Sequence, residues 1–237
     1  MVSRNYLSYG SVLSTDYGVY VIGQQADDST EREVESVTVA GRSGDLHIDK
    51  KRFKNLTVTY TCVIVEEAKR RYEDYIDALL TEGANKRLED GLHPEWTRLG
   101  TLRGAVKPTL SRFRDLYRFD LAFDCGPQKW LKSGEQEIAI SDSYEIFNPT
   151  RHPAKPLLKV TGAGTIAIGN ERITISTAKD DMTIDCAMED AYGRETGQNY
   201  NSLITLTGQD FPSIPAGKTT ITVSGCSAVL TPRWWKL

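Results

Sequence analysis

The chain has 237 residues, and its 29 lysines and arginines against 32 aspartates and glutamates leave a formal net charge of −3. Neutralising nucleic-acid phosphates requires an excess of basic side chains, so this balance argues against a nucleic-acid-binding protein. With 39% hydrophobic and 26% charged residues the composition is typical of a soluble globular protein. No apolar run approaches the roughly 18 residues that a membrane helix requires.

The first part of the sequence alternates between turn clusters and strand patterns. A short β-like run covers residues 19–22, and the acidic stretch 27–35 predicts a loop. A strand is expected at residues 34–39, before the turn cluster 41–45. The clearest strand pattern follows, because apolar residues alternate with threonines, as in a half-buried strand. Its apolar face consists of Leu56, Val58, Tyr60, Cys62 and Ile64.

A single helix is predicted at about residues 66–82, where the period of the apolar residues changes. Glu66 and Glu67 suit the first turn of a helix, and Gly83 suits the position just after its end. The predicted helix should cover one face of a sheet. Its apolar residues recur at three- and four-residue steps: Ala68, Tyr72, Tyr75, Ile76, Leu79 and Leu80.

A seam between two folded units is expected after the strand that ends at Phe123. The stretch 85–100 is loop-like, with room for a short strand, and residues 101–106 predict another strand. After Phe123 come Gly126 and Pro127, and several prolines precede a new apolar run at residues 157–160. Beyond this seam, short alternating runs separated by polar turns predict a β-sandwich. The expected fold is therefore mainly β, with domains at residues 1–140 and 141–237.

Bulk features also bear on the compartment and on the thiols. Residues 2–5 lack the apolar core of a secretory signal, which predicts folding in a cytoplasm. The four cysteines lie far apart, and no pair has the spacing of a zinc or redox motif. They are therefore expected to be reduced residues, mostly in the core: Cys62, Cys125, Cys186 and Cys226.

Several motifs match catalytic or binding patterns in letters only. The run 162–164 (GAG) precedes a strand-like sequence, whereas a dinucleotide site needs a helix there. Ser43 resembles a nucleophile elbow, but Asp45 stands where that motif requires glycine. His47, His93 and His152 show no metal-ligand spacing. An enzyme is consequently the weakest of the functional hypotheses.

Four sequence blocks, in order along nearly the whole chain, carry a resemblance to a known family. They are residues 39–46 (VAGRSGDL), 119–131 (ending in GPQKWL), 148–165 (with NPT, Pro156 and GAGT) and 232–237 (PRWWKL). Together they resemble the distal tail proteins (Dit) of long-tailed, non-contractile bacteriophages. The sequence departs from the family pattern at Ala40, where proline is common, and before Pro127, where a basic residue is expected. Neither position carries chemistry.

The resemblance implies an N-terminal β-barrel or sheet domain with one helix, and a C-terminal galectin-like β-sandwich. The N-terminal domains would close into a hexameric ring, single or paired, at the end of the tail tube. Implied partners are further copies of the chain, the tail-tube protein, a tail-tip or tail-associated lysin protein, and a receptor-binding protein. The chain would be a structural protein of the phage tail tip, assembled in the host bacterial cytoplasm. It would have no catalytic residue, cofactor or metal.

Two sets of residues are candidates for contacts. The stretch around residues 27–46 is polar and poorly suited to a core, which favours ring contacts there: Val34, Glu35, Val37, Val39, Arg42, Asp45 and Leu46. The alternative function is a carbohydrate-binding adhesion module acting through the C-terminal sandwich. Such a site needs an exposed aromatic beside polar groups, although these tryptophans could equally pack in the core. Its candidates are Trp234, Trp235, Arg194 and Asn199.

Overall fold

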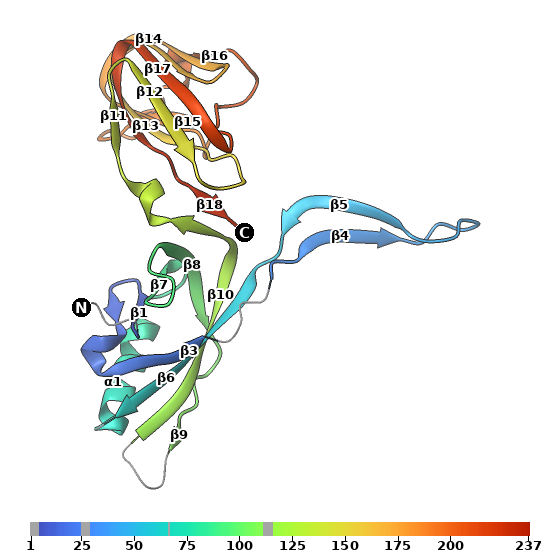
Figure 1. Ribbon diagram of the computed structural model, residues 1–237, viewed down its shortest axis with the longest axis vertical. Coiled ribbons are helices and arrows are strands. Elements are labelled where there is room, and N and C mark those ends of the chain that lie inside the picture. The colour runs from blue at the N-terminus through green and yellow to red at the C-terminus, as the bar shows by residue number, and fades with distance from the viewer. Residues whose placement is uncertain (1–4, 25–28, 66, 111–115) are drawn as a thin grey trace. The chain divides into compact units, whose positions relative to one another are not determined.

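The computed structural model describes residues 5–24, 29–65, 67–110 and 116–237 (Figure 1). The protein is mainly β, as predicted, and the described residues contain one α-helix. The chain divides into two compact units, the first formed by residues up to Lys129 with Leu237 and the second by Trp130–Lys236. The predicted boundary after residue 140 is too late, because β11 (Ile138–Ile140) already pairs within the sheet of the second unit.

The first unit is built on a sheet with the strand order β2-β1-β7-β8-β10-β6-β3, and β9 pairs beside β10. Strands β6 and β10 are antiparallel, with Leu121 opposite Tyr60, and their inward side chains are buried while Thr57 is exposed. This confirms the alternating pattern read at residues 56–64. The strands are β1 Leu7–Tyr9, β2 Val12–Leu13, β3 Val19–Gln24, β6 Leu56–Val65, β7 Lys86–Asp90, β8 Trp96–Arg103, β9 Thr109–Leu110 and β10 Leu116–Leu131.

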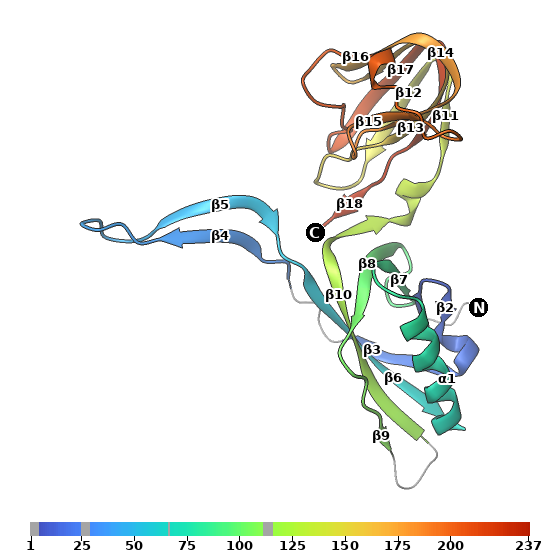
Figure 2. The same ribbon diagram turned by 180° about the vertical axis from the view of Figure 1, so that it is seen from behind.

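Helix α1 (Ala68–Thr81) covers one face of this sheet (Figure 2). Its buried residues Ala68, Tyr75 and Leu79 join the core formed by β6 and β10. The helix begins only at Ala68, because Glu67 has a left-handed φ of 48°. Gly83, with a φ of 82°, follows the last turn and ends the helix, as its position in the sequence predicted. Glu66 lies outside the described residues.

The second unit contains a seven-stranded antiparallel sheet in the order β11-β17-β13-β14-β15, with β12 also pairing β17 and β16 also pairing β14. The sheet curls, and one apolar cluster that includes Leu158, Ile166, Ile173 and Trp234 fills its interior. Besides β11, its strands are β12 Ser143–Asn148, β13 Leu157–Ile168, β14 Glu171–Asp185, β15 Asp190–Gly193, β16 Ile204–Leu206 and β17 Gly217–Thr231. The last strand, β18 (Trp235–Lys236), pairs with β10 instead. Short 3-10 helices lie at Ser14–Tyr17, Lys132–Glu135 and Asn201–Leu203.

Glycines allow the long strands of the second unit to bend. Gly162 and Gly225 have φ values of 97° and 79°, and the pairing of β13 with β14 and with β17 shifts register near them. β13 keeps β14 and β17 as partners throughout, whereas β17 pairs β12 in its first half and β11 in its second. The run 162–164 lies within β13, so the interpretation of this motif as strand is confirmed.

Two loop predictions were wrong. Residues 32–35 belong to a strand, although their charged sequence had suggested a loop. The stretch 85–100 contains β7 and the first half of β8. In β7 the buried residues are Leu88 and Asp90, so a single apolar side chain marks its inner face and no alternation is visible in the sequence.

Candidate assembly surfaces

The first candidate surface is a hairpin formed by β4 (Arg32–Val37) and β5 (Leu46–Phe53). These strands pair with each other as a separate two-stranded sheet, and Figure 1 draws them as an arm of their own. The structure brings the predicted ring-contact residues together on this hairpin. Val34, Glu35, Val37 and Leu46 lie in its strands, and Val39, Arg42 and Asp45 lie in the connection between them.

One face of the hairpin exposes three apolar side chains beside Glu35. Val37 is paired with Leu46, and Glu35 is paired with Ile48, so these four side chains share a face. Leu46 and Ile48 are 41% and 43% exposed. A two-stranded hairpin without a core is marginally stable in water, and exposed apolar surface of this kind marks an interaction site. Sequence reasoning missed Ile48, because charged residues surround it.

Cross-strand ion pairs line the hairpin. Arg32 Nη1 lies 2.7 Å from Asp49 Oδ2, and Lys50 pairs with Glu35. The hydrogen bond from Lys50 lowers the pKa of Glu35. Exposed pairs contribute little to stability, so their main consequence is to favour one register of the two strands. Two further pairs are Arg52–Glu33 and Lys54–Glu31, each at 3.0 Å.

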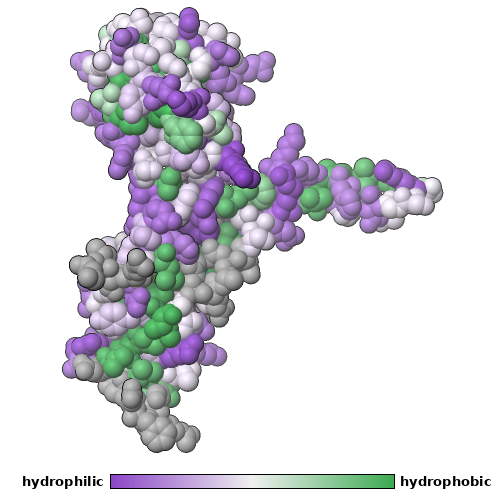
Figure 3. All heavy atoms as spheres, viewed as in Figure 1, coloured by the Kyte–Doolittle hydropathy of each residue, from purple (hydrophilic) through white to green (hydrophobic). Residues whose placement is uncertain are grey.

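The second candidate surface is the edge of the first unit's sheet at β3. Among the described strands, β3 pairs with β6 alone, and on its other side the Val21 backbone N–H donates to the Asn5 carbonyl at 2.9 Å, so this edge is covered at Val21 only. Tyr20 and Ile22 are 42% and 51% exposed, and Val65 on the neighbouring β6 is also exposed. In the view of Figure 1 the sheet of the first unit lies in front of α1, and Figure 3 shows hydrophobic surface on this unit in the same view. The rest of this edge, with its apolar neighbours, is a candidate for pairing with another chain.

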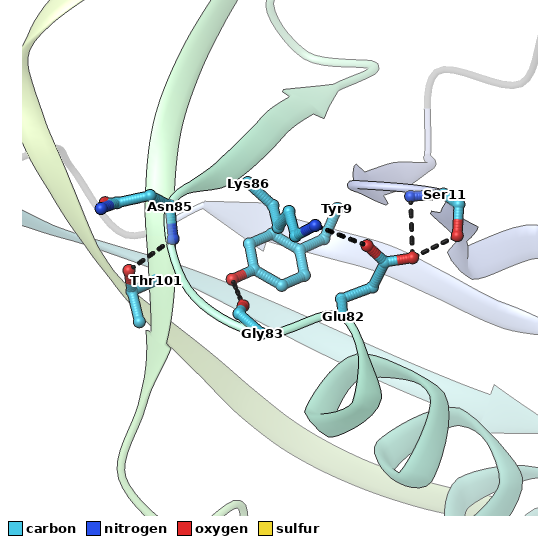
Figure 4. Close-up of polar contacts among 7 residues, drawn as sticks. All are labelled: Tyr9, Ser11, Glu82, Gly83, Asn85, Lys86 and Thr101. Atoms are coloured by element: carbon cyan, nitrogen blue, oxygen red, sulfur yellow. Dashed lines mark hydrogen bonds and ion pairs between the residues drawn. The ribbon is translucent and has the colours of Figure 1, made fainter.

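A polar cluster ties the end of α1 to the turn between β1 and β2 (Figure 4). The Glu82 carboxylate accepts hydrogen bonds from the Ser11 backbone N–H, at 3.0 Å, and from the Ser11 hydroxyl. Its other oxygen lies 3.8 Å from Lys86 Nζ. The Tyr9 hydroxyl donates to the Gly83 carbonyl at 2.5 Å. The Ser11 hydrogen bonds lower the pKa of Glu82, since they stabilise its charged form.

We expect Ser11→Ala to lower the thermal unfolding midpoint by a few degrees at neutral pH, because Glu82 loses a hydrogen-bond donor. The lowered pKa means that Glu82 contributes its full stabilisation above the ordinary glutamate pKa of about 4.3. That contribution is lost as the pH falls through the lower pKa of the folded state. The difference between variant and parent should therefore shrink in acid, and calorimetry over a pH series measures it. A deficit independent of pH would contradict this role for Glu82.

The residues proposed for carbohydrate contact do not form one exposed platform. Trp234 is 4% exposed and belongs to the core of the second unit, so the packing interpretation is correct for it. Trp235 stacks on His152 with ring centroids 4.3 Å apart, and its Nε1 donates to the Pro153 carbonyl. Asn199 and Arg194 are exposed on the segment after β15.

Arg233 and Asp185 form an ion pair that sequence reasoning missed, in which Asp185 is buried and Arg233 is 31% exposed. Arg233 donates two hydrogen bonds, of 2.7 and 3.0 Å, to the two Asp185 carboxylate oxygens. The same carboxylate accepts from the backbone N–H groups of Ala187 and Met188. Burial by itself raises the pKa of Asp185, but these hydrogen bonds and the guanidinium charge outweigh it, and the pKa is lowered. The carboxylate is therefore ionised at neutral pH.

The motifs that matched catalytic or metal sites do not assemble into a reactive centre. Ser43 lies in the exposed turn of the hairpin, and His47 Nδ1 lies 2.9 Å from the Ser36 hydroxyl. No group of three metal-ligating side chains occurs among the described residues. Within the same residues, no helix is long and apolar enough to cross a membrane.

The cysteines behave as core residues, as predicted. All four are free, and Cys226 is partly buried while the other three are fully buried. Burial raises the pKa of Cys62 and that of Cys186 to about 12. Both thiols are consequently protonated at neutral pH and poor nucleophiles.

Comparison with known proteins finds similarity in structure alone. No family model matches the sequence, and no curated protein matches it. The crystal structure of SPP1 Dit, described as a paradigm of the hub adsorption apparatus in phages that infect Gram-positive bacteria, superposes with a TM-score of 0.72 at 14% identity. The match covers 99% of this chain and 100% of that one, so the two proteins share a fold.

Two structures of the phage P2 baseplate in its activated conformation give weaker matches. The structure with Ca has a TM-score of 0.47 at 10% identity and covers 97% of this chain and 98% of that one. The structure with Sr has a TM-score of 0.48 at 11% identity and covers 99% of this chain and 98% of that one.

Proposed function

We propose that this chain is a distal tail hub, a structural protein of a bacteriophage tail tip. The observation that carries the proposal is the shared fold with SPP1 Dit over the full length of both chains. The sequence blocks that resemble the Dit family agree with it, although the identity to SPP1 Dit is 14%. A hub of this kind works through its interfaces and needs no catalytic centre.

The two candidate surfaces suit a ring of identical copies. The hairpin offers Leu46 and Ile48, whereas the sheet edge offers Tyr20 and Ile22, so the two surfaces differ. A contact between two different patches is heterologous, and repetition of such a contact produces a closed ring when the rotation closes. We propose that the ring holds six copies, as in the family that the sequence resembles, and that the hairpin of each copy contacts its neighbour.

The proposed ring places this chain between other tail components. One face would bind the tail-tube protein and the other a tail-tip or tail-associated lysin protein. The C-terminal units would hold receptor-binding proteins. The site of action is the tail tip of the virion, after assembly in the host bacterial cytoplasm.

The ring is tested by the mass of the purified protein, from size-exclusion chromatography with light scattering and from negative-stain images. The parent should form particles of about six copies. Val37→Asp combined with Ile48→Asp should give monomers, because charges replace the apolar face of the hairpin. Ser36→Asp, on the opposite face, is the matched control and should leave the ring intact.

One outcome would count against the hub, and another against the hairpin as its contact. The first is a parent that stays monomeric at every concentration and binds neither tube nor tip proteins. The second is a ring that survives the double substitution as well as the control, which would exclude the hairpin as its contact.

A further inference from the structure

A polar groove lies on the second unit. Its volume is about 570 Å³, within the range of about 300–1,000 Å³ that small-molecule sites occupy. The turn between β13 and β14 forms one wall, and the start of β17 with the segment before it forms the other. The lining side chains that carry polar groups are Asn170, Glu171, Ser213, Lys218, Thr219, Thr220 and Thr222.

The lining can both donate and accept hydrogen bonds. Thr220 and Thr222 are exposed and project from the outer face of β17, because they alternate with the buried Ile221. Each hydroxyl is a donor and an acceptor, and Asn170 adds an amide with both capacities. Thr219 alternates with Thr220 and Thr222 and is 93% buried, so it lies on the inner side of the strand.

Two charged side chains line the groove, and one of them has an opposite charge beside it. Lys218 Nζ lies 2.8 Å from Glu145 on the neighbouring β12. Glu171 accepts a hydrogen bond of 3.0 Å from the Ser213 backbone N–H. Among these groups one negative charge, that of Glu171, remains without a counter-ion, which disfavours an anionic ligand, and the groove suits a neutral ligand rich in hydroxyl groups.

An exposed aromatic ring stands beside the groove. Phe147 on β12 is 60% exposed and lies directly opposite Lys218 on β17. Directly paired residues share a face of the sheet, with Cβ atoms about 4.5–5.5 Å apart. The next pair on that face is Glu145 with Thr220, so the ring, the ion pair and the threonine hydroxyls follow one another along two strands. β12 is at the edge of the sheet, which leaves room for a ligand over the ring.

We propose that this groove, with Phe147 at its rim, is a binding site for a neutral saccharide. A sugar ring has an apolar face of C–H groups and a rim of hydroxyls that donate and accept. The Phe147 ring would stack on the apolar face of the sugar, as amphipathic ligands pack on exposed aromatics. The sugar hydroxyls would form hydrogen bonds with Thr220, Thr222 and Asn170. The site lies apart from Trp235, so it differs from the carbohydrate contact expected from the sequence.

The test is saturation-transfer difference NMR on the full chain, which detects millimolar binding to a monomer or to a ring. The probes are maltose, lactose, cellobiose and di-N-acetylchitobiose. At least one should receive saturation from the protein, and Phe147→Ala should weaken its binding about tenfold, the change that loss of a stacking contact produces. Tyr144→Ala is the matched control, since it removes an exposed aromatic from the opposite face of β12 and should leave binding unchanged.

Thr222→Val is a second, nearly isosteric variant, which removes one hydroxyl from an exposed strand position without disturbing the core. It should also weaken binding, whereas Thr57→Val, at an exposed strand position of the first unit, should not. Absence of transfer to all four probes would overturn the proposal. So would binding that Phe147→Ala and Thr222→Val leave unchanged. Either result leaves the hub function untouched, because ring assembly is measured separately.

Discussion

Gly164→Ala should destabilise the second unit by about 3 kcal/mol, at the upper end of the cost of overpacking. A Cβ atom at Gly164 would overlap the Ser224 carbonyl oxygen and lie 2.8 Å from the Cys226 backbone nitrogen. These are main-chain atoms of the paired strand β17, so no side chain can rotate to make room. β13 and β17 would have to separate in the middle of the curled sheet. Urea unfolding followed by circular dichroism and tryptophan fluorescence measures the loss.

Gly208→Ala is the control for this prediction. The nearest atom to its added Cβ is the Asp210 backbone nitrogen at 4.0 Å, an ordinary contact. A surface substitution of this kind should change the free energy of unfolding by no more than about 0.5 kcal/mol. Equal stabilities of the two variants would show that the approach of β13 to β17 is looser than the structure places it.

Arg233→Met should cost about 2–3 kcal/mol, because the buried Asp185 carboxylate loses its cation and two hydrogen bonds but keeps those from Ala187 and Met188. The Asp185 side chain is 5% exposed, and Arg233 supplies two of its hydrogen bonds. The loss should be smaller when Asp185→Asn is added, since the variant then buries no charge. Urea unfolding of both single variants and of the double variant measures the coupling between the two residues.

The pH dependence of this pair follows from the lowered pKa of Asp185. Because the pKa of Asp185 is lower in the folded state, its carboxylate contributes its full stabilisation above the ordinary aspartate pKa of about 3.9. That contribution is lost as the pH falls through the pKa of the folded state. In Arg233→Met the effect of burial dominates and the carboxyl protonates more readily, so the deficit relative to the parent should shrink in acid. A deficit that stays constant down to acid unfolding would contradict the ion pair.

Lys155→Met is the matched control for the ion pair. Lys155 Nζ lies 2.6 Å from Glu189, but both side chains are about half exposed. Water screens such a pair, and its removal should cost less than about 1 kcal/mol. A comparable loss in both variants would mean that burial does not distinguish the two pairs.

Local pattern was sufficient for the regular elements with one buried face. The alternation at residues 56–64 and the three- and four-residue steps of α1 are visible because a sheet face and a helix face each bury residues at a fixed interval. The end of the helix at Gly83 was also readable, since a left-handed residue there favours glycine. The same reasoning identified a β-rich second unit.

The hairpin of β4 and β5 was only half readable. Its strands are exposed on both faces, so the sequence shows no alternation of buried and solvated residues, and residues 32–35 looked like loop. The polar, acidic character of the stretch nevertheless indicated correctly that it is no part of a core. Ile48 was missed because its neighbours along the chain are polar or charged. Its apolar partners on the same face are Leu46, two residues before it, and Val37 on the paired strand.

The sequence by itself determined the mainly β class, the single helix, the buried thiols and the place where solvent-exposed residues gather. Only the tertiary structure decided that Trp234 is buried, that Arg233 reaches Asp185 and that Phe147 stands opposite Lys218. The physical reason is distance along the chain. Periodicity reports which residues of one element face a core, whereas 48 residues separate Arg233 from Asp185, and such pairs form only when strand register brings them together.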